Sequence, residues 1–439
     1  MTLAPLTLTR RPQSAPSPLD GLPVAIIGAG PVGLAAAAQL RERGIDVVVF
    51  EAGARAGAAI ARWGHTRLFT PWPYLVDPAA SRLLERAGWV LPEETALPTG
   101  RELLDRYLLP LAALPELADS IRYGATVLAV SRRGMDRTRS GDRAGTPFVL
   151  RVQTDAGVTD SYARAVIDTS GTYSSPNGLL ASGLDPAQPD DLDENLVHGL
   201  PDVLGADRAR FAGTHTLVVG AGHSAANTLI ALGTLAESEP GTRISWAIRS
   251  ATPARVYGSD EDELAARASL GARVRALVRS GRVTLIERFE IDDVRAEAAG
   301  VTVTGLRAGE RFSVAADTVV AATGFRPDLA PLREIRLSLD EIVEAPRALA
   351  PLIDPNLHSC GTVPAHGVVE LAHPEPDFYI AGMKSFGRAP TFLLATGYEQ
   401  VRSIADELAG NVAAARLVQL VLPETGVCST GGDSGSCCS

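Results

Sequence analysis

The chain has 439 residues, of which 46% are hydrophobic and 21% are charged, and its formal net charge is −10. This composition predicts a globular protein with room for two or three domains, and no run of the roughly 18 apolar residues that a membrane-spanning helix needs is present. The acidic balance excludes nucleic acid as a general partner, because phosphate binding requires a concentrated basic surface.

The four cysteines are too few and too unevenly placed for a disulfide framework. Cys360 stands alone, whereas Cys428, Cys437 and Cys438 lie close to the C-terminus. This usage favours a reducing, cytoplasmic location. Residues 1–20 contain proline and serine but no long apolar segment, so we expect a flexible leader and not a signal peptide.

A first unit, expected over residues 21–200, begins with the apolar strand Val24–Ile27. A glycine turn follows, with Gly28, Gly30 and Gly33 in the pattern G-x-G-x-x-G, and Leu34–Arg43 reads as a helix. A strand, a tight turn and a helix N-terminus together make a pyrophosphate site.

The next strand, Val47–Phe50, ends at Glu51, about 20 residues beyond the glycine turn. An acid at this place binds ribose hydroxyls in doubly wound folds. The alternative interpretation is a loop residue or a helix cap.

The rest of the first unit contains a predicted helix, Arg101–Ala113, and two predicted strands, Arg122–Arg132 and Phe148–Thr154. Between these strands, residues 134–147 look disordered because they lack apolar residues in a regular pattern. The apolar strand 166–171 then ends in small residues that allow close approach of a cofactor.

Residues 176–201 are rich in proline, glycine and acids, and we interpret them as a connection between domains. A second unit, expected over residues 213–326, repeats the scheme. Its strand Thr216–Val219 precedes the turn Gly220–Ala225 and a helix over 225–235.

The strand Arg243–Ile248 of the second unit ends at Arg249 and not at an acid. A guanidinium can form paired hydrogen bonds with the 2′-phosphate of NADP, which an acid would repel. The sequence therefore predicts NADPH here; the alternative is that Arg249 merely faces solvent.

After the second unit, residues 327–425 return to the first. Asp377–Gly382 supplies another strand, and Pro390–Leu408 is predicted as a helix with proline at its start. The expected fold class is α/β, with two Rossmann-like dinucleotide-binding domains of the three-layer ββα type and the second inserted into the first.

The two glycine turns, Glu51, Arg249 and the strand end 322–325 resemble those of two-dinucleotide flavoproteins, and within these the flavin-containing monooxygenase-like group. More narrowly, the segments Arg67–Trp72, Gly382–Phe392 and Val421–Cys428 are similar to flavin monooxygenases of bacterial arsenic-resistance operons.

The resemblance implies FAD in the first unit and NADPH in the second. The residues that it implies for FAD are Gly28, Gly30, Pro31, Gly33, Glu51, Trp63, Val127, Gly171, Gly382 and Thr391. Those that it implies for NADP are Gly220, Gly222, His223, Ser224, Ala225 and Arg249. Where related proteins place an aspartate after the last glycine, this chain has Met383.

The resemblance also places the flavin ring against the N-terminus of the helix at Pro390, with N–H groups around Thr391 and Phe392 facing the reduced ring. Lys384 could add positive charge there, which makes it a candidate catalytic residue, or it could be a surface lysine.

The implied activity is NADPH-dependent reduction of FAD, formation of a C4a-(hydro)peroxyflavin with O₂, and oxygenation of a small soft nucleophile such as a trivalent arsenical. An alternative is a thiol, disulfide or metalloid reductase that uses Cys428, Cys437 and Cys438 in a flexible tail, residues 426–439. A non-catalytic metalloid-binding sensor is a third hypothesis. No metal-binding spacing is evident, and a homodimer is left open.

Overall fold

A computed structural model describes residues 17–257, 265–354, 363–390 and 392–420. Its first unit is built on a parallel sheet of five strands in the order β16-β7-β1-β2-β3. The strands are β1 (Val24–Ile27), β2 (Val47–Phe50), β3 (Ile121–Arg122), β7 (Ala165–Asp168) and β16 (Phe378–Ile380). Because β16 pairs with β7, the C-terminal part of the chain does return to the first unit.

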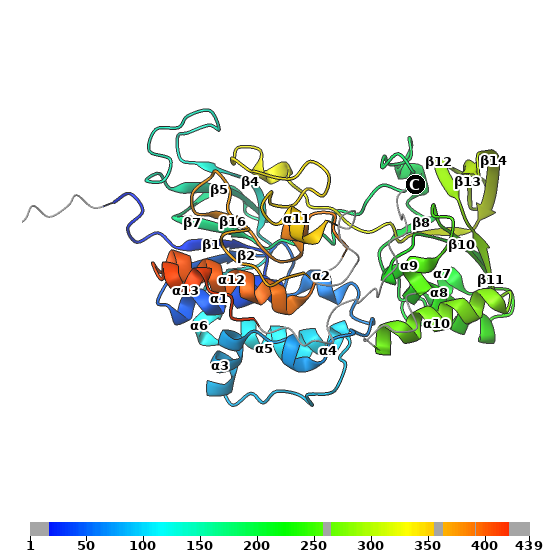
Figure 1. The fold of residues 1–439 in the computed structure, drawn as a ribbon, viewed down its shortest axis with the longest axis horizontal. Helices are drawn as coiled ribbons and strands as arrows, with labels where there is room; N and C mark the ends of the chain where they lie inside the picture. The colour runs from blue at the N-terminus through cyan, green and yellow to red at the C-terminus, as the bar shows by residue number, and fades with distance from the viewer. Residues whose placement is uncertain (1–16, 258–264, 355–362, 391, 421–439) are drawn as a thin grey trace, which may run out of the picture.

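One face of this sheet carries helices and the other carries a second sheet (Figure 1). The packed helices include α1 (Pro31–Glu42) and α12 (Leu394–Leu408), which share one hydrophobic core. The opposite face is covered by the antiparallel strands β4 (Thr126–Arg132), β5 (Phe148–Thr154) and β6 (Gly157–Ala163). The shorter helical segments of this unit are α2 (Ala58–Ala61), η1 (Trp72–Tyr74), α3 (Pro78–Arg86), α4 (Gly100–Leu103), η2 (Leu104–Leu108), α5 (Leu109–Ala112), α6 (Pro115–Ala118), η4 (Ala330–Leu332), α11 (Ala350–Ile353), η5 (Gly382–Phe386) and α13 (Val412–Arg416).

The second unit repeats this three-layer arrangement beside the first (Figure 1). Its parallel sheet has the order β11-β10-β9-β15-β8. The strands are β8 (Leu196–His198), β9 (His215–Val219), β10 (Arg243–Ala247), β11 (Val283–Ile286) and β15 (Thr318–Ala321). Helices α8 (His223–Ser238) and α10 (Ala265–Arg279) cover one face, and β12 (Phe289–Ala296), β13 (Val301–Arg307) and β14 (Glu310–Ala316) cover the other. Short helices η3 (Asp190–Leu192), α7 (Arg208–Phe211) and α9 (Ala254–Tyr257) complete it.

The predicted fold class is therefore confirmed, but the first unit does not extend to residue 200. Strand β8, at Leu196–His198, pairs in parallel with β15 and so belongs to the second sheet. The two connections between the units lie side by side, since Pro176 and Phe325 form an antiparallel bridge and Asn177 Nδ2 donates to the Thr323 carbonyl at 3.1 Å.

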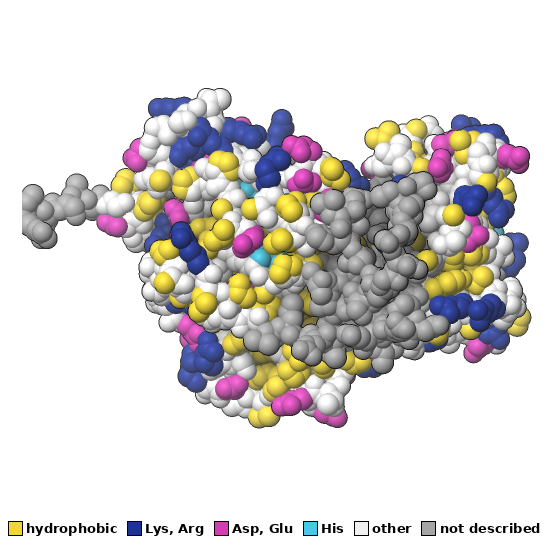
Figure 2. Space-filling view, in the orientation of Figure 1, with side chains coloured by type: hydrophobic (Ala, Val, Ile, Leu, Met, Phe, Trp, Pro, Cys, Tyr) yellow, Lys and Arg dark blue, Asp and Glu magenta, His cyan; other side chains and the backbone are white. Residues whose placement is uncertain are grey.

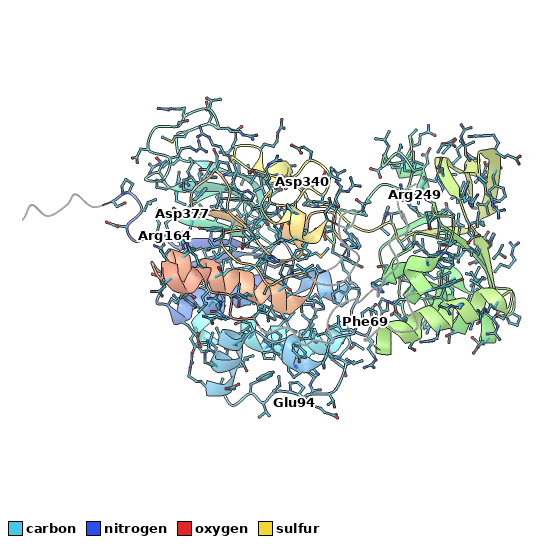
Figure 3. The ribbon with its side chains drawn as sticks, in the orientation of Figure 1. Phe69, Glu94, Arg164, Arg249, Asp340 and Asp377 are labelled. Atoms are coloured by element: carbon cyan, nitrogen blue, oxygen red, sulfur yellow. The ribbon has the colours of Figure 1, made fainter. Side chains whose placement is uncertain are left out.

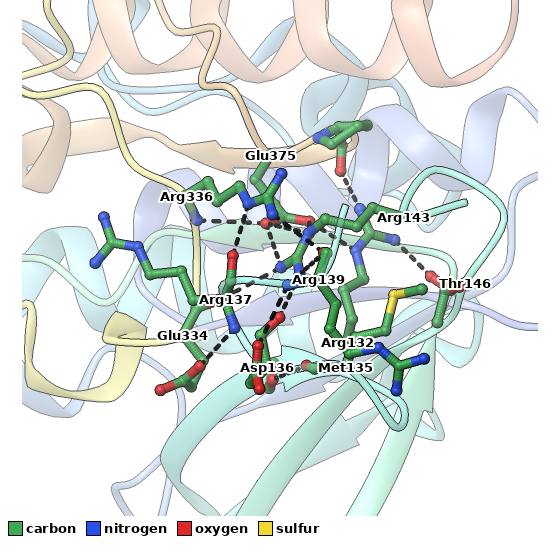
Figure 4. A network of polar contacts seen from close by, with 12 residues as sticks. Arg132, Met135, Asp136, Arg137, Arg139, Arg143, Thr146, Glu334, Arg336 and Glu375 are labelled. Atoms are coloured by element: carbon green, nitrogen blue, oxygen red, sulfur yellow. Dashed lines mark hydrogen bonds and ion pairs between the residues drawn. The ribbon is translucent and has the colours of Figure 1, made fainter. Parts of the chain in front are cut away.

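The expectation that residues 134–147 are disordered is wrong. Glu375, which is far away in sequence and fully buried, accepts hydrogen bonds from Arg132 Nε at 2.8 Å and Arg143 Nη2 at 2.7 Å (Figure 4). Arg143 Nη1 in turn donates to the Asp136 carbonyl at 2.8 Å. Charge pairing, and not apolar periodicity, thus holds this loop against the first unit.

On the described part of the face drawn in Figure 2, both units present basic and acidic side chains interspersed with hydrophobic ones. Within the described ranges, no helix has both the length and the apolar character that crossing a membrane demands.

Asp77 is a buried carboxyl group at the N-terminus of α3. It accepts hydrogen bonds from Ala80 N–H and Gln39 Nε2, each at 2.9 Å. Burial nevertheless raises its pKa to about 6. The pKa of Asp77 is thus higher in the folded protein than in the unfolded chain. Its contribution to stability is therefore fully present below about pH 4 and is lost as pH rises through 6. The loss amounts to about 3 kcal/mol of unfolding free energy.

We therefore expect the unfolding free energy of the wild type to fall relative to that of Asp77→Asn as pH rises from 4.5 to 7.5. Denaturant titration at several pH values measures this difference. A difference that is independent of pH would show that Asp77 keeps an ordinary pKa.

Candidate functional site

The glycine turn of the first unit lies at the carboxyl end of β1. Gly28 has φ +98°, and a Cβ there would lie 3.0 Å from the Ser170 Cα. A Cβ at Gly33 would lie 1.9 Å from the Gly28 carbonyl oxygen, so this close packing of helix on turn admits no side chain. A Cβ at Gly30, by contrast, would meet no protein atom within 4 Å. The turn therefore leaves open space in front of the helix, as a pyrophosphate cradle requires.

Helix α1 begins at this turn with Pro31 in its first position, and no side chain caps its N-terminus. Glu51 lies beside the same turn. Its carboxylate accepts hydrogen bonds from Ala29 N–H at 2.7 Å and Gly53 N–H at 2.8 Å. Glu51 therefore lies at the edge of the open turn and directly after strand β2, which is the place that the sequence predicts for it.

The other residues predicted to contact FAD come from several elements, and two of them follow strands of the first sheet. Gly171 and Gly382 follow β7 and β16, with φ +73° and +72°, and Val127 lies in β4 at an irregularity in its pairing with β5. Trp63 is half-buried against the main core. Thr391 lies outside the described residues.

Helix α12 begins at Leu394 and not at Pro390, so the expected start of this helix is wrong by one turn. Proline at position 390 therefore precedes the helix. Among the described residues no side chain caps the helix, so within that part of the chain its N-terminal N–H groups have no side-chain partner. In Figure 1 this end of α12 points toward the second unit.

Lys384 is not a surface lysine. Its Nζ lies 2.7 Å from Asp168 Oδ2, and its side chain is 3% exposed. Nζ also donates to Ser170 Oγ at 3.0 Å. Asp168 therefore balances the charge that Lys384 would bring to a flavin. Sequence reasoning missed Asp168 and Ser170 as partners, because neither stands near Lys384 in the chain.

A buried polar network joins η5 to α12 beside this ion pair. Gln400 accepts from Gly382 N–H at 2.7 Å and contacts His366 Nε2 at 2.7 Å and Ser385 Oγ at 2.9 Å. Burial lowers the pKa of His366, so this histidine is neutral at pH 7. The network fixes the loop that follows β16 relative to the helix.

The glycine turn of the second unit has the same construction. Gly220 has φ +131°, and a Cβ there would lie 2.2 Å from the Ala322 carbonyl oxygen. Gly222 has open space around its Cβ position. Helix α8 follows from His223 without a side-chain cap; Ser224 lies in its first turn and Ala225 is fully buried.

Arg249 is exposed just beyond β10. Its Nη1 makes one long hydrogen bond of 3.4 Å to the Ala181 carbonyl. The guanidinium is therefore available to an anionic ligand, although its position at the surface also fits the alternative of a solvent-facing side chain.

If Arg249 binds the 2′-phosphate, Arg249→Ala should raise KM for NADPH about 10- to 100-fold, because a hydrogen bond to a charged group contributes about 1.5–3 kcal/mol. KM for NADH should not change. Steady-state kinetics with both nucleotides measures the effect. Arg282→Ala is a matched control, since Arg282 is an exposed arginine of the same unit paired with Glu237 at 2.7 Å. An equal loss with NADH and NADPH would contradict the assignment.

Aromatic contacts join the two units. Phe69, from the first unit, lies beside the second unit (Figure 3), with its ring 5.4 Å from that of His223. Close to the two connections, Tyr173 lies 5.0 Å from Phe325, and the Arg62 guanidinium lies over the Tyr173 ring. The glycine turn of the second unit is therefore in contact with the first unit through His223.

Cys428, Cys437 and Cys438 lie outside the described residues. Among the residues that the structure does describe, no group of three or more His, Cys, Asp and Glu side chains could hold a metal ion.

Family models match both units. Residues 26–85 match the NAD(P)-binding Rossmann-like domain, and residues 148–356 match the pyridine nucleotide-disulphide oxidoreductase domain. Among curated proteins, the chain is 28% identical over 196 residues to flavin-containing monooxygenase FMO GS-OX-like 2 of Arabidopsis thaliana, covering 39% of this chain and 40% of that protein. It is also 29% identical over 320 residues to a ferredoxin–NADP reductase of Saccharopolyspora erythraea, covering 72% and 77%. Across the plant monooxygenases, the match spans about two fifths of their length.

Solved structures share the whole fold. A bacillithiol disulfide reductase of Bacillus cereus aligns with TM-score 0.62 at 19% identity, covering 89% of this chain and 99% of that one. The cadaverine monooxygenase DfoA of Erwinia amylovora, bound to FAD, aligns with TM-score 0.63 at 15% identity, covering 94% and 99%. The chain thus has an FAD-binding and an NAD(P)H-binding domain in a fold that serves both oxygenases and reductases.

Proposed function

We propose that this chain, which has the two-domain fold of the flavin-dependent pyridine nucleotide-disulphide oxidoreductases and resembles the flavin-containing monooxygenases, is an NADPH-dependent flavin monooxygenase. The observation that carries the proposal is the pair of open glycine turns, Gly28–Gly33 and Gly220–Ala225, each at the carboxyl edge of its own parallel sheet. Glu51 beside the first and Arg249 beyond the second support FAD in one and NADPH in the other.

Bound FAD would accept electrons from NADPH and pass them to O₂, which is chemistry that the protein itself cannot supply. The chain's own contribution is to hold both nucleotides and to exclude water. The uncapped N-terminus of α12 carries a partial positive charge that favours an anionic ring edge. Trp72 is 1% exposed within the main core, which favours a packing role for this side chain over contact with the flavin.

The substrate class that we propose is a small soft nucleophile, with sulfur, nitrogen or trivalent arsenic as the oxygen acceptor. Support for arsenic comes only from the segments Arg67–Trp72, Gly382–Phe392 and Val421–Cys428. The last of these lies outside the described residues.

The test begins with the purified protein, which should be yellow and should oxidise NADPH. After anaerobic reduction with NADPH, mixing with O₂ in a stopped-flow instrument should give a long-lived species that absorbs between reduced and oxidised flavin. Product analysis with a panel of arsenicals, thiols and amines then identifies the substrate. Immediate return of oxidised flavin with release of peroxide would contradict the monooxygenase proposal, and a colourless protein that takes up no FAD would exclude any flavoenzyme.

A second candidate is a thiol or metalloid reductase that uses the C-terminal cysteines, and one observation favours it. After α13 the chain runs back along α12 toward the N-terminal end of that helix: Arg402 Nη2 donates to the Leu417 carbonyl at 2.8 Å, and Gln419 N–H donates to Glu399 Oε1 at 3.0 Å. Leu420 is therefore close to the first half of α12. Cys428 follows eight residues later, a span of at most about 29 Å.

Truncation after Pro423 separates the two candidates. A monooxygenase whose cysteines play no part should keep its turnover and its affinity for arsenite. Loss of NADPH-dependent disulfide or metalloid reduction, with FAD content unchanged, would favour the reductase.

A further inference from the structure

Lys384, Asp168 and Ser170 form a polar cluster at the carboxyl edge of the first sheet. Asp168 is the last residue of β7, and Lys384 belongs to η5, which follows β16. The two strands are paired, with Ile380 opposite Asp168. The side chains of Lys384 and Asp168 are 3% and 2% exposed, whereas Ser170 is exposed. The serine is therefore the one member of the cluster that is accessible to a ligand, and its Cα lies beside the Gly28 turn.

The charges on its two partners fix the hydrogen atom of the Ser170 hydroxyl group. A carboxylate can only accept and an ammonium can only donate. Ser170 Oγ therefore donates its single proton to Asp168 Oδ1 at 2.7 Å and accepts from Lys384 Nζ at 3.0 Å. One lone pair of Oγ remains. The cluster thus presents a hydrogen-bond acceptor, and not a donor, to a ligand in the site.

The position of β7 indicates which part of FAD meets this acceptor. Along the sheet edge, Glu51 follows β2, the open turn at Gly30 follows β1, and Ser170 follows β7. Beyond β7 come β16 and η5, and Gln400 ties η5 to α12. With the ribose at Glu51, the pyrophosphate at the turn and the flavin at the N-terminus of α12, the segment that crosses β7 is the ribityl chain.

We propose that Ser170 accepts a hydrogen bond from a ribityl hydroxyl group of FAD, and that Asp168 and Lys384 are positioning residues that hold the serine hydroxyl for this purpose. An acceptor fits a ribityl hydroxyl, which can donate, and does not fit a phosphate oxygen, which can only accept. A buried ion pair adds little net stability by comparison with apolar residues, so a role in orienting Ser170 accounts for the pair. The inference concerns FAD binding and does not require the proposed reaction.

The test measures affinity of the apoprotein for FAD and for ADP, which has the adenosine and pyrophosphate but no ribityl chain. Ser170→Ala should weaken FAD binding about three- to tenfold, which corresponds to one hydrogen bond, and leave ADP binding unchanged. Ser170→Thr keeps the hydroxyl and should restore FAD affinity. Unchanged FAD binding in Ser170→Ala, or an equal loss with ADP, would overturn the proposal.

The ion pair is tested without leaving a buried charge alone. The double variant Lys384→Met with Asp168→Asn is neutral, and we expect its apoprotein to unfold at nearly the wild-type denaturant concentration. Its FAD affinity should remain as weak as that of Ser170→Ala, because the serine proton is no longer fixed. FAD affinity equal to that of the wild type would show that the pair has no positioning role. None of these measurements depends on NADPH oxidation, so failure of the monooxygenase proposal would leave their outcome intact.

Discussion

Gly222→Ala should weaken the binding of NADPH strongly while leaving the protein folded. Gly222 is the N-cap of α8, its φ of −114° suits any residue, and an added Cβ would meet no protein atom within 4 Å. The methyl group would instead enter the space in which the backbone approaches a pyrophosphate. Loss of charge-assisted hydrogen bonds worth about 1.5–3 kcal/mol predicts a rise in KM of about 10- to 100-fold.

Gly220→Ala is the matched comparison two residues away. At φ +131°, with its Cβ 2.2 Å from the Ala322 carbonyl oxygen, it must distort the protein itself. We expect this variant to lose thermal stability as well as NADPH turnover, whereas Gly222→Ala keeps its Tm and its bound FAD. An unchanged KM in Gly222→Ala would mean that the pyrophosphate binds elsewhere.

The nucleotide turns were predictable because their signal is local. A strand, a turn and a helix in immediate succession specify their own conformation, and the glycines at Gly28, Gly33 and Gly220 are required by close backbone contacts. The same holds for the insertion of the second unit, since Phe378–Ile380 has the apolar pattern of a buried strand.

The errors arose where long-range contacts decide the structure. Strand β8 has only three residues and is identified by its pairing with β15. Proline favours the first turn of a helix, so Pro390 predicts a start there, yet α12 begins at Leu394. The partner of Lys384 lies 216 residues away in the chain, a separation that no local pattern reveals.

The loop at residues 134–147 is the clearest case of order that depends on a distant residue, and it leads to the second large effect. Glu375→Gln should lower the free energy of unfolding by about 3–5 kcal/mol, the loss expected when one partner of a buried ion pair is neutralised. The Arg132 and Arg143 side chains are 0% and 4% exposed. Burial lowers the pKa of Arg132, and its hydrogen bond and charge interaction with Glu375 oppose that shift.

Glu334→Gln is the matched control, because Glu334 is an exposed acid that binds the same loop through Arg137 N–H at 2.8 Å. We expect it to change stability by less than about 0.5 kcal/mol. Denaturant unfolding measures both variants, and limited proteolysis within residues 134–147 reports the loop directly. If Glu375→Gln were as stable as the control, neutral acceptors alone would have to satisfy the two arginines. The other acceptors in the structure are backbone carbonyls, those of Thr146 and Pro376 for Arg132 and those of Asp136, Arg139 and Glu334 for Arg143. Neutral carbonyls cannot balance two buried positive charges. We therefore expect the loop to be cut faster in Glu375→Gln even where the sheet remains folded.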